Sequence, residues 1–258
     1  MSLHMKTTFQ LKLFNAFAAI LGLSSALGYA QSEERLAAAV AQVKLEVPAH
    51  LVFVGDSLTA LFPASNYVAQ VRTALQSRFG DRVRVTNAGV GGDFITRVQS
   101  RLKKDVLELQ PKPTHVFIFL GHNDSKLTSS SGYRESLVNA DDSERQYRAV
   151  VSAIRETLAA KIIILSGTSS VFEITKATAE KAAKAGKAHN LFGKPEAMER
   201  FNAIARKVAE DLGADYVDLY EPTRTHPNKP SLFTQDGVHI NEKGSALVAL
   251  EVLRYLSR

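Results

Sequence analysis

Short apolar runs alternate with amphipathic segments along most of the chain. The apolar runs are rich in β-branched residues and contain few polar positions, which is typical of strands buried on both faces of a parallel sheet. Between them, apolar residues recur every three or four positions, which is the period of an α-helix. The expected strands span residues 51–54, 83–86, 115–120, 162–165 and 216–219, and the expected helical faces span 68–79, 95–109, 147–158, 201–212 and 247–253.

The order of these elements predicts five βα units in series. Gly80 and Gly213 stand where two of the helices should end, and Pro111 and Pro113 follow a third. A further helix is expected around Glu33–Val43, ahead of the first strand. Consecutive βα units with right-handed crossovers form a parallel sheet covered by helices on both faces. We therefore expect an α/β fold in which ligands bind beyond the carboxyl ends of the strands.

Four chemically distinctive motifs stand at the predicted strand ends or just before the last helix. Taken singly, each also fits an ordinary turn, and the first fits a tight turn with a serine at the helix N-cap. The glycines of the second motif allow close backbone approach to a ligand and expose N–H groups. The motifs are Gly55-Asp56-Ser57-Leu58-Thr59, Asn87-Ala88-Gly89-Val90-Gly91-Gly92-Asp93, Gly121-His122-Asn123-Asp124 and Asp236-Gly237-Val238-His239.

The last of these motifs carries the most specific chemical signal. Asp236 lies three residues ahead of His239. In a compact turn, an acid at that spacing can bind one imidazole nitrogen and fix the tautomer, which leaves the other nitrogen to face a nucleophile. Four other histidines have no acid three residues before them, and we expect them to be ordinary surface or partly buried residues. They are His50, His115, His189 and His226.

Together and in this order, the four motifs resemble those of the SGNH, or GDSL-type, hydrolase family, over nearly the whole chain after the first thirty residues. The resemblance implies a flavodoxin-like three-layer α/β/α sandwich with a five-stranded parallel sheet. It also implies a catalytic triad of Ser57 as nucleophile, His239 as base and Asp236 as orienting acid. The oxyanion donors that it implies are the backbone N–H groups of Ser57 and Gly92 and the side-chain amide of Asn123.

One position departs from the pattern of that family. Members often carry Thr or Ser shortly after the aspartate of the glycine motif, whereas this chain has Phe94 directly after Asp93. The local hydrogen bonding of this loop should therefore differ, and Gly91 is an alternative to Gly92 as oxyanion donor. By analogy with the family, Asp56 supports the serine loop and does not carry a proton.

The implied reaction is hydrolysis of an oxygen ester through a Ser57 acyl-enzyme, without a metal or an organic cofactor. The family's range suggests acetylated carbohydrates, lysophospholipids, thioesters or small alkyl and aryl esters, and we expect short acyl groups. The partner is then a small-molecule or carbohydrate ester. Apolar residues in segment 167–194 could line a cap over the serine, or could equally anchor a surface helix.

Three other functions are considered. A catalytically silent module of the same fold would bind carbohydrate. An acyltransferase would share the acyl-enzyme and differ only in the acceptor that reaches it. A metallophosphoesterase would leave Ser57 without a task, and no Asp-x-His pair follows the first strand; its metal ligands would be Asp56, His122, Asp124, Asp236 and His239.

The first thirty residues suggest export. Lys6 and Lys12 precede an uncharged stretch over residues 13–30 that ends in small residues, which is typical of a secretory signal; an uncleaved membrane anchor is the alternative. The four residues before Met5 are interpreted as a cloning remnant. We therefore expect a periplasmic or secreted protein with a signal peptide over residues 1–30, a leader helix or linker over 31–48 and a hydrolase domain over 49–258.

Composition narrows the remaining choices. The chain has 258 residues, of which 45% are hydrophobic and 22% charged, which excludes disordered and membrane-channel classes. It has no cysteine, so thiolate and disulfide chemistry are excluded. Removal of residues 1–30 takes away two lysines and no acid, so the net charge falls from +6 to +4. The bases are scattered among acids, so we expect no nucleic-acid partner, and no stable membrane insertion after signal cleavage.

Overall fold

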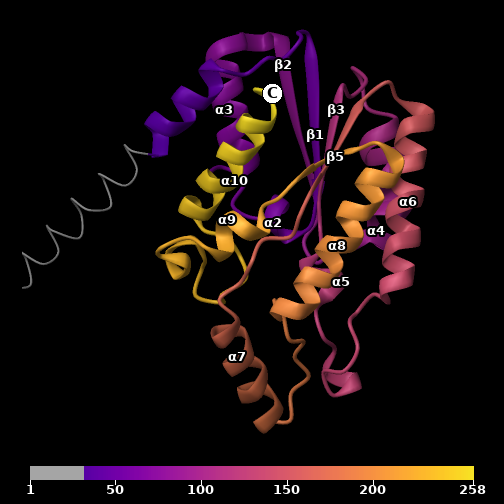
Figure 1. The fold of residues 1–258 in the computed structure, drawn as a ribbon, viewed down its shortest axis with the longest axis vertical. Coiled ribbons are helices and arrows are strands. Elements are labelled where there is room, and N and C mark those ends of the chain that lie inside the picture. Colours follow the sequence, from indigo (N-terminus) through magenta and orange to yellow (C-terminus); the bar gives the residue numbers. More distant parts are fainter. Residues whose placement is uncertain (1–31) are drawn as a thin grey trace, which may run out of the picture.

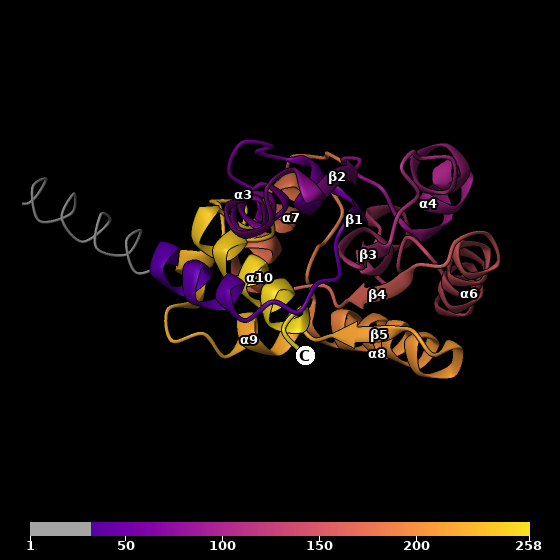
Figure 2. The ribbon, with the colours of Figure 1, turned by 90° about the horizontal axis from the view of Figure 1, so that it is seen from above.

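The computed structural model describes residues 32–258, which form a five-stranded parallel sheet with helices on both faces. The expected signal peptide lies outside these residues. The parallel sheet that the alternating pattern predicts is confirmed, and Figure 2 shows its strands in the order β2-β1-β3-β4-β5. The strands are β1 (Ala49–Gly55), β2 (Val83–Gly89), β3 (His115–Phe119), β4 (Lys161–Leu165) and β5 (Asp215–Val217).

The helices form the two outer layers of the predicted three-layer sandwich (Figure 1). One layer contains α3 (Tyr67–Phe79), α10 (Glu242–Tyr255) and the helical residues 32–41, and the other contains α4 (Ile95–Leu102), α6 (Ala140–Thr157) and α8 (Pro195–Leu212). Alternate residues of β1 point into opposite layers, because successive strand side chains face opposite sides. Leu51 and Phe53 are buried in the first layer, and Val52 and Val54 in the second.

Shorter elements cluster at the carboxyl ends of the strands. Figure 1 shows α2 and α5 directly below the sheet, with α7 extending away from it. These elements follow strands directly or lie in the connections between strands. They are α2 (Ser57–Ala60), α5 (His122–Ser125), α7 (Phe172–Lys184) and α9 (Tyr220–Arg224), with 3₁₀ turns at Gly80–Arg82, Ser129–Ser131 and Lys229–Leu232.

The strand order determines where the site lies. The chain passes from β1 outward to β2 at the edge of the sheet, and then returns to β3 on the opposite side of β1. The loops that leave β1 and β3 therefore turn to opposite faces of the sheet, which opens a space at their carboxyl ends. Two of the four motifs, at Gly55–Leu58 and Gly121–Asp124, occupy this switch point.

Two predicted elements differ in detail from the structure. The last strand ends at Val217, before the predicted residue 219, because the Asp218 side chain accepts the N–H groups of Tyr220 and Glu221 and starts α9. The helix predicted over residues 95–109 contains a π-helical turn at Lys103–Leu107. The apolar spacing that predicted this helix is compatible with such a turn and does not reveal it.

The helical residues 32–41 and the segment that follows them pack onto the first layer. Val40, Val43 and Leu45 are buried in the same cluster as α3 and α10, and the Lys44 N–H donates to the Leu256 carbonyl over 2.8 Å. Within residues 32–258, no helix combines the length and the apolar character that a membrane crossing needs.

A close approach between β2 and α2 holds the short helix in place. A Cβ atom on Gly89 would lie 2.6 Å from the Ala60 nitrogen and 2.7 Å from the Thr59 Cβ. These distances are too short for any side chain, so α2 can pack against the end of β2 only because residue 89 is glycine. The second glycine of the same loop, Gly91, has no atom within 4 Å of such a position.

We predict that Gly89→Ala lowers the free energy of unfolding by about 1–3 kcal/mol, because the added methyl group must displace α2. Gly91→Ala is the matched control, and we expect it to change that free energy by no more than about 0.5 kcal/mol. Urea unfolding followed by circular dichroism measures both values. Equal stabilities for the two variants would contradict the packing argument.

Candidate functional site

The chain that leaves β1 turns at once into the short helix α2, whose first residue is Ser57. Asp56 is the N-cap, and its Oδ1 accepts the Leu58 N–H over 2.9 Å. The other end of α2 is held by the Thr59 carbonyl, which accepts the side-chain amides of Asn66 (2.8 Å) and Asn87 (2.7 Å). Ser57 therefore stands on a turn that is constrained at both ends.

The loop before α10 is organised around the carboxylate of Asp236. Its Oδ1 accepts the N–H groups of Val238 (2.8 Å) and His239 (2.9 Å) and the Thr234 hydroxyl (2.8 Å). Its Oδ2 lies 2.5 Å from the His239 Nδ1. Gly237 has a φ of +75°, which allows this tight turn. The carboxylate thus orients both the backbone and the ring of His239.

The structure brings the predicted serine, histidine and aspartate together. The Ser57 Oγ lies 2.8 Å from the His239 Nε2, although the two residues are 182 positions apart in the chain. Since Nδ1 faces Asp236 and Nε2 faces Ser57, the imidazole connects the carboxylate to the hydroxyl. This geometry can take a proton from a serine hydroxyl as the oxygen attacks an electrophile.

Asp236 is ionised over the whole neutral range. Partial burial of the carboxyl works to raise its pKa, but the hydrogen bonds from the His239 ring, the backbone N–H groups of Val238 and His239, and the Thr234 hydroxyl outweigh it and lower the pKa to about 2. A permanently negative carboxylate beside Nδ1 keeps that nitrogen protonated and leaves Nε2 with its lone pair toward Ser57.

The side chain of Asn123 comes from α5, after β3, and its amide lies beside the serine loop. The Asn123 Nδ2 donates to the Asp56 Oδ2 over 3.2 Å, and the Asn123 Oδ1 accepts the Lys126 Nζ over 3.0 Å. Gly92, on the neighbouring loop, has a φ of +80°. Among residues 32–258, the backbone N–H groups of Ser57 and Gly92 have no hydrogen-bond acceptor. That these three groups act as oxyanion donors stays a prediction.

The departure at Phe94 has a structural explanation. Phe94 occupies the N-cap position of α4 and its side chain makes no capping hydrogen bond. The first N–H of the helix, that of Ile95, is instead accepted by the Asp124 Oδ1 over 3.0 Å, from α5. Burial raises the pKa of Asp124 to about 7, and its Oδ2 is buried without a hydrogen-bond partner among the described residues.

Arg101 joins the loops of the site, and the sequence analysis did not identify it. Its guanidinium donates to the carbonyls of Gly55 (3.2 Å) and Ala88 (2.9 Å) and lies 2.6 Å from the Asp93 carboxylate. These partners lie at the ends of β1 and β2 and in the glycine loop. The only local signal was an acid four residues later, Asp105, which accepts the same guanidinium over 2.8 Å.

The residues proposed as metal ligands are not arranged as a metal site. His122 is buried, its Nε2 lies 2.9 Å from the Thr168 Oγ1, and burial lowers its pKa to about 4. Asp56 and Asp124 are also buried, whereas Asp236 belongs to the exposed loop. Within the described part of the chain, no three His, Asp or Glu side chains converge in a way that could hold a metal ion.

The depression next to the serine is small, with about 180 Å³ of empty space. Besides Ser57 and His239, it is lined by Leu58, Leu61, Phe62, Asn66, Ile240 and Ser245. Phe62 is 52% exposed.

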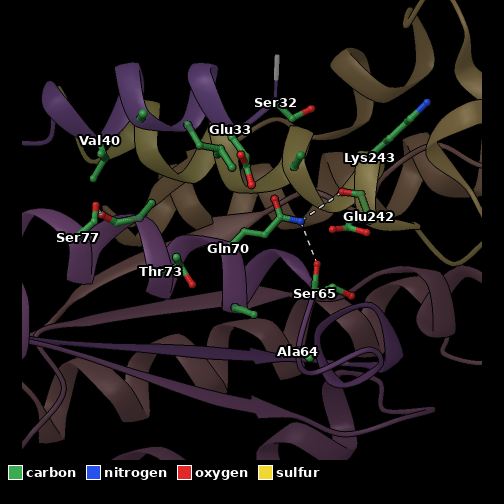
Figure 3. A pocket seen from close by; sticks show the side chains of 15 residues that line it. Ser32, Glu33, Val40, Ala64, Ser65, Gln70, Thr73, Ser77, Glu242 and Lys243 are labelled. Carbon is green, nitrogen blue, oxygen red and sulfur yellow. Dashed lines mark hydrogen bonds between the residues drawn. The ribbon is translucent and has the colours of Figure 1, made fainter. Parts of the chain in front are cut away.

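A separate cavity of about 340 Å³ lies between residues 32–40, α3 and α10 (Figure 3). There the Gln70 amide donates to the carbonyls of Ser65 and Glu242. Neither Ser57 nor His239 lines that cavity.

Segment 167–194 begins beside the histidine loop. The Val171 N–H donates to the Gly237 carbonyl over 2.8 Å, and Ile174 would be 3.1 Å from a Cβ on Gly237. From this contact α7 extends away from the sheet (Figure 1). The Phe192 ring lies with its centroid 5.1 Å from the Lys126 Nζ. That the segment caps the serine stays a prediction.

The chain is similar to known proteins both in its sequence profile and in its fold. The profile of the GDSL-like Lipase/Acylhydrolase family matches residues 53–247. A search of curated protein sequences finds no match. Solved structures with the same fold include a lipase/acylhydrolase from Enterococcus faecalis (21% identity, 81% of this chain and 95% of that chain covered, TM-score 0.62). Another is an acetylxylan esterase from Geobacillus stearothermophilus (23% identity, 81% and 94% covered, TM-score 0.59). A third is an alpha/beta hydrolase enzyme from the metagenome of Lake Arreo, Spain (24% identity, 81% and 94% covered, TM-score 0.62).

The buried carboxyl of Asp124 generates a prediction about stability and pH. Its pKa is raised from 3.8 to about 7 in the folded protein. Between these two pKa values the folded chain keeps a proton that the unfolded chain has released. The free energy of unfolding therefore falls as the pH rises from about 4 to about 7. Asp124→Asn retains an acceptor for Ile95 but has no charge to bury. Relative to the wild type, the variant should gain roughly 2 kcal/mol in free energy of unfolding between pH 5 and pH 8.

Urea unfolding of both proteins at the two pH values measures this difference. Asp81→Asn, at an exposed turn, is the control for the loss of one surface negative charge. A difference between wild type and Asp124→Asn that stays constant with pH would show that the carboxyl titrates alike in the folded and unfolded chain.

Proposed function

This chain belongs to the GDSL-like lipase/acylhydrolase family, and on that premise we propose that it is a serine esterase that hydrolyses short-chain carboxylic esters. The family membership and the esterase among the similar folds support hydrolysis of an ester in general. The observation that carries the finer proposal is the 2.8 Å contact between the Ser57 Oγ and the His239 Nε2.

In the proposed reaction, the Ser57 Oγ attacks the ester carbonyl carbon as its proton passes to the His239 Nε2. The tetrahedral intermediate collapses when the carbon–oxygen bond to the alcohol breaks, and His239 returns the proton to the departing alcohol. Water then attacks the acyl-enzyme by the same steps, which releases the acid and restores the serine. Asp236, with its pKa near 2, stays ionised and stabilises the imidazolium that forms twice in the cycle.

The negative charge that develops on the carbonyl oxygen needs fixed donors in the right place. We assign this role to the backbone N–H groups of Ser57 and Gly92 and to the Asn123 amide. Within residues 32–258, the backbone N–H groups of Ser57 and Gly92 have no other hydrogen-bond acceptor, which supports the assignment. This chemistry uses only residues of the chain, and we propose that the reaction needs no metal and no organic cofactor.

The shape of the surface supports a short acyl group. The depression beside Ser57 is small, with about 180 Å³ of empty space, which favours a short acyl group over a long one. The acetylxylan esterase of similar fold acts, by its name, on an acetyl ester of a polysaccharide. We therefore favour acetylated carbohydrates as the substrate class, with lysophospholipids as the other candidate. We also propose that residues 1–30 direct export, so that the ester is met outside the cytoplasm.

A chain-length series of 4-nitrophenyl esters tests the reaction class and the depth of the acyl site together. We expect kcat/KM for acetate and butyrate to exceed that for octanoate by about tenfold, which is the effect of roughly 1.4 kcal/mol. Ser57→Ala should lower kcat by at least about 10⁴-fold, because within residues 32–258 no other hydroxyl forms a hydrogen bond with the His239 ring. Ser100→Ala, an exposed serine on α4, is the control. Unchanged turnover in Ser57→Ala would instead favour a chain that binds carbohydrate without cleaving it.

The oxyanion assignment predicts a specific kinetic change in Asn123→Ala. Loss of one donor that acts mainly in the transition state should lower kcat by about a hundredfold and change KM by less than about threefold. Steady-state kinetics with 4-nitrophenyl acetate separate the two parameters, and circular dichroism checks that the variant is folded. A rise in KM with kcat retained would place Asn123 in substrate binding and remove it from the oxyanion site.

A further inference from the structure

The amide of Asn123 lies between a carboxylate and an ammonium group. Its Nδ2 donates to the Asp56 Oδ2, and its Oδ1 accepts from the Lys126 Nζ. The two ends of an amide have almost the same shape and differ in that nitrogen donates while oxygen accepts, so the neighbours decide which end points where. For Asn123, an acceptor on one side and a donor on the other select the same orientation.

The contact with Lys126 is the shorter of the two constraints. The bond to Asp56 is 3.2 Å long, at the upper end of the range for N–H···O bonds. The bond from Lys126 is 3.0 Å long and its donor carries a charge. A charged donor makes a stronger hydrogen bond than a neutral one and also draws electron density toward the amide oxygen, which makes the amide N–H a better donor. No other side chain of residues 32–258 contacts the Asn123 Oδ1.

Lys126 itself is held in place from several directions. Its backbone carbonyl accepts the Leu137 N–H over 2.9 Å, and the next residue, Leu127, is bridged to both Ser136 and Leu191. Its Nζ lies 5.1 Å from the centroid of the Phe192 ring, which attracts a cation to its face. The side chain is half-buried, and burial lowers the pKa of its ammonium group, while the Asp56 and Asp124 carboxylates oppose that shift. A lysine free in solvent would have none of these restraints.

We propose that Lys126 is a positioning residue for ester hydrolysis, which holds the Asn123 amide so that the N–H not bonded to Asp56 faces the developing oxyanion. The inference rests on the proposed function, because it gives Lys126 a task only if Asn123 is an oxyanion donor. Lys126 need not touch the substrate. It acts through the orientation and polarisation of one amide, and its effect should therefore appear in kcat.

The experiment is a double-mutant cycle of Lys126 and Asn123 in the full chain, measured with 4-nitrophenyl acetate. We expect Lys126→Met to lower kcat about tenfold with KM changed less than about twofold, since the amide keeps one of its two restraints. In an Asn123→Ala background the same substitution should cost less than about twofold, because the amide through which it acts is gone. Lys126→Arg retains a charged donor and should recover most of kcat.

Each outcome of the cycle decides something. A tenfold further loss in the Asn123→Ala background would overturn the proposal, because Lys126 would then act independently of the amide. A rise in KM with kcat retained would overturn it in favour of direct contact between Lys126 and the substrate. Lys112→Met, at the opposite end of β3, is the matched control for loss of a lysine, and its kinetic constants should equal those of the wild type.

The cycle also separates this inference from the proposed function. If the wild-type chain hydrolyses no ester of the series, the proposed function fails. If the wild type is active and Asn123→Ala is impaired, but Lys126→Met matches the wild type, the function stands and only the role of Lys126 fails. Urea unfolding of each variant shows whether a change in kcat reflects loss of the folded state; Lys126→Gln replaces Lys126→Met if the latter does not fold.

Discussion

The arrangement of the site depends on the buried carboxylate of Asp56. One of its oxygens caps the helix that begins with Ser57, and the other accepts the amide of Asn123 from the far side of the switch point. Burial raises the pKa of this carboxyl to about 6. The Leu58 N–H, the nearby His239 and the Asn123 amide each lower the pKa, but burial outweighs them. A buried carboxylate is tolerated only with such partners. Its two hydrogen bonds therefore tie the end of β1 to the end of β3.

A second layer of polar contacts holds the loops around this carboxylate. Asp124 caps α4, and Arg101 links the ends of β1 and β2 to Asp93. The cost of this arrangement is visible in Asp124, whose second oxygen is buried without a partner among the described residues and whose pKa is raised. Asp56 and Asp124, two buried carboxyls at one edge of the sheet, repel each other when both are ionised, and both attract the Lys126 ammonium group. The site thus gives up some stability to fix its geometry.

The space beside the serine is small, with about 180 Å³ of empty volume, and its walls combine apolar side chains, among them the exposed Phe62, with Asn66 and Ser245. The cavity of about 340 Å³ between residues 32–40, α3 and α10 does not include the serine. The chemistry proposed for this site depends on the rigidity of three loops at strand ends and of the loop before α10.

Hydrophobic periodicity was sufficient to predict the five strands, the main helices and the three-layer arrangement, because burial on two faces of a sheet leaves a pattern that can be read along the chain. The four motifs likewise led, through their resemblance to the family, to Ser57, His239 and Asp236, which the structure brings together. The contact between Ser57 and His239, the capping of α4 by Asp124, and the contacts of Arg101 and Lys126 were decided only by the tertiary structure. Each joins segments through side chains whose partners are selected by distance in space after folding, and no local pattern of residues records that distance.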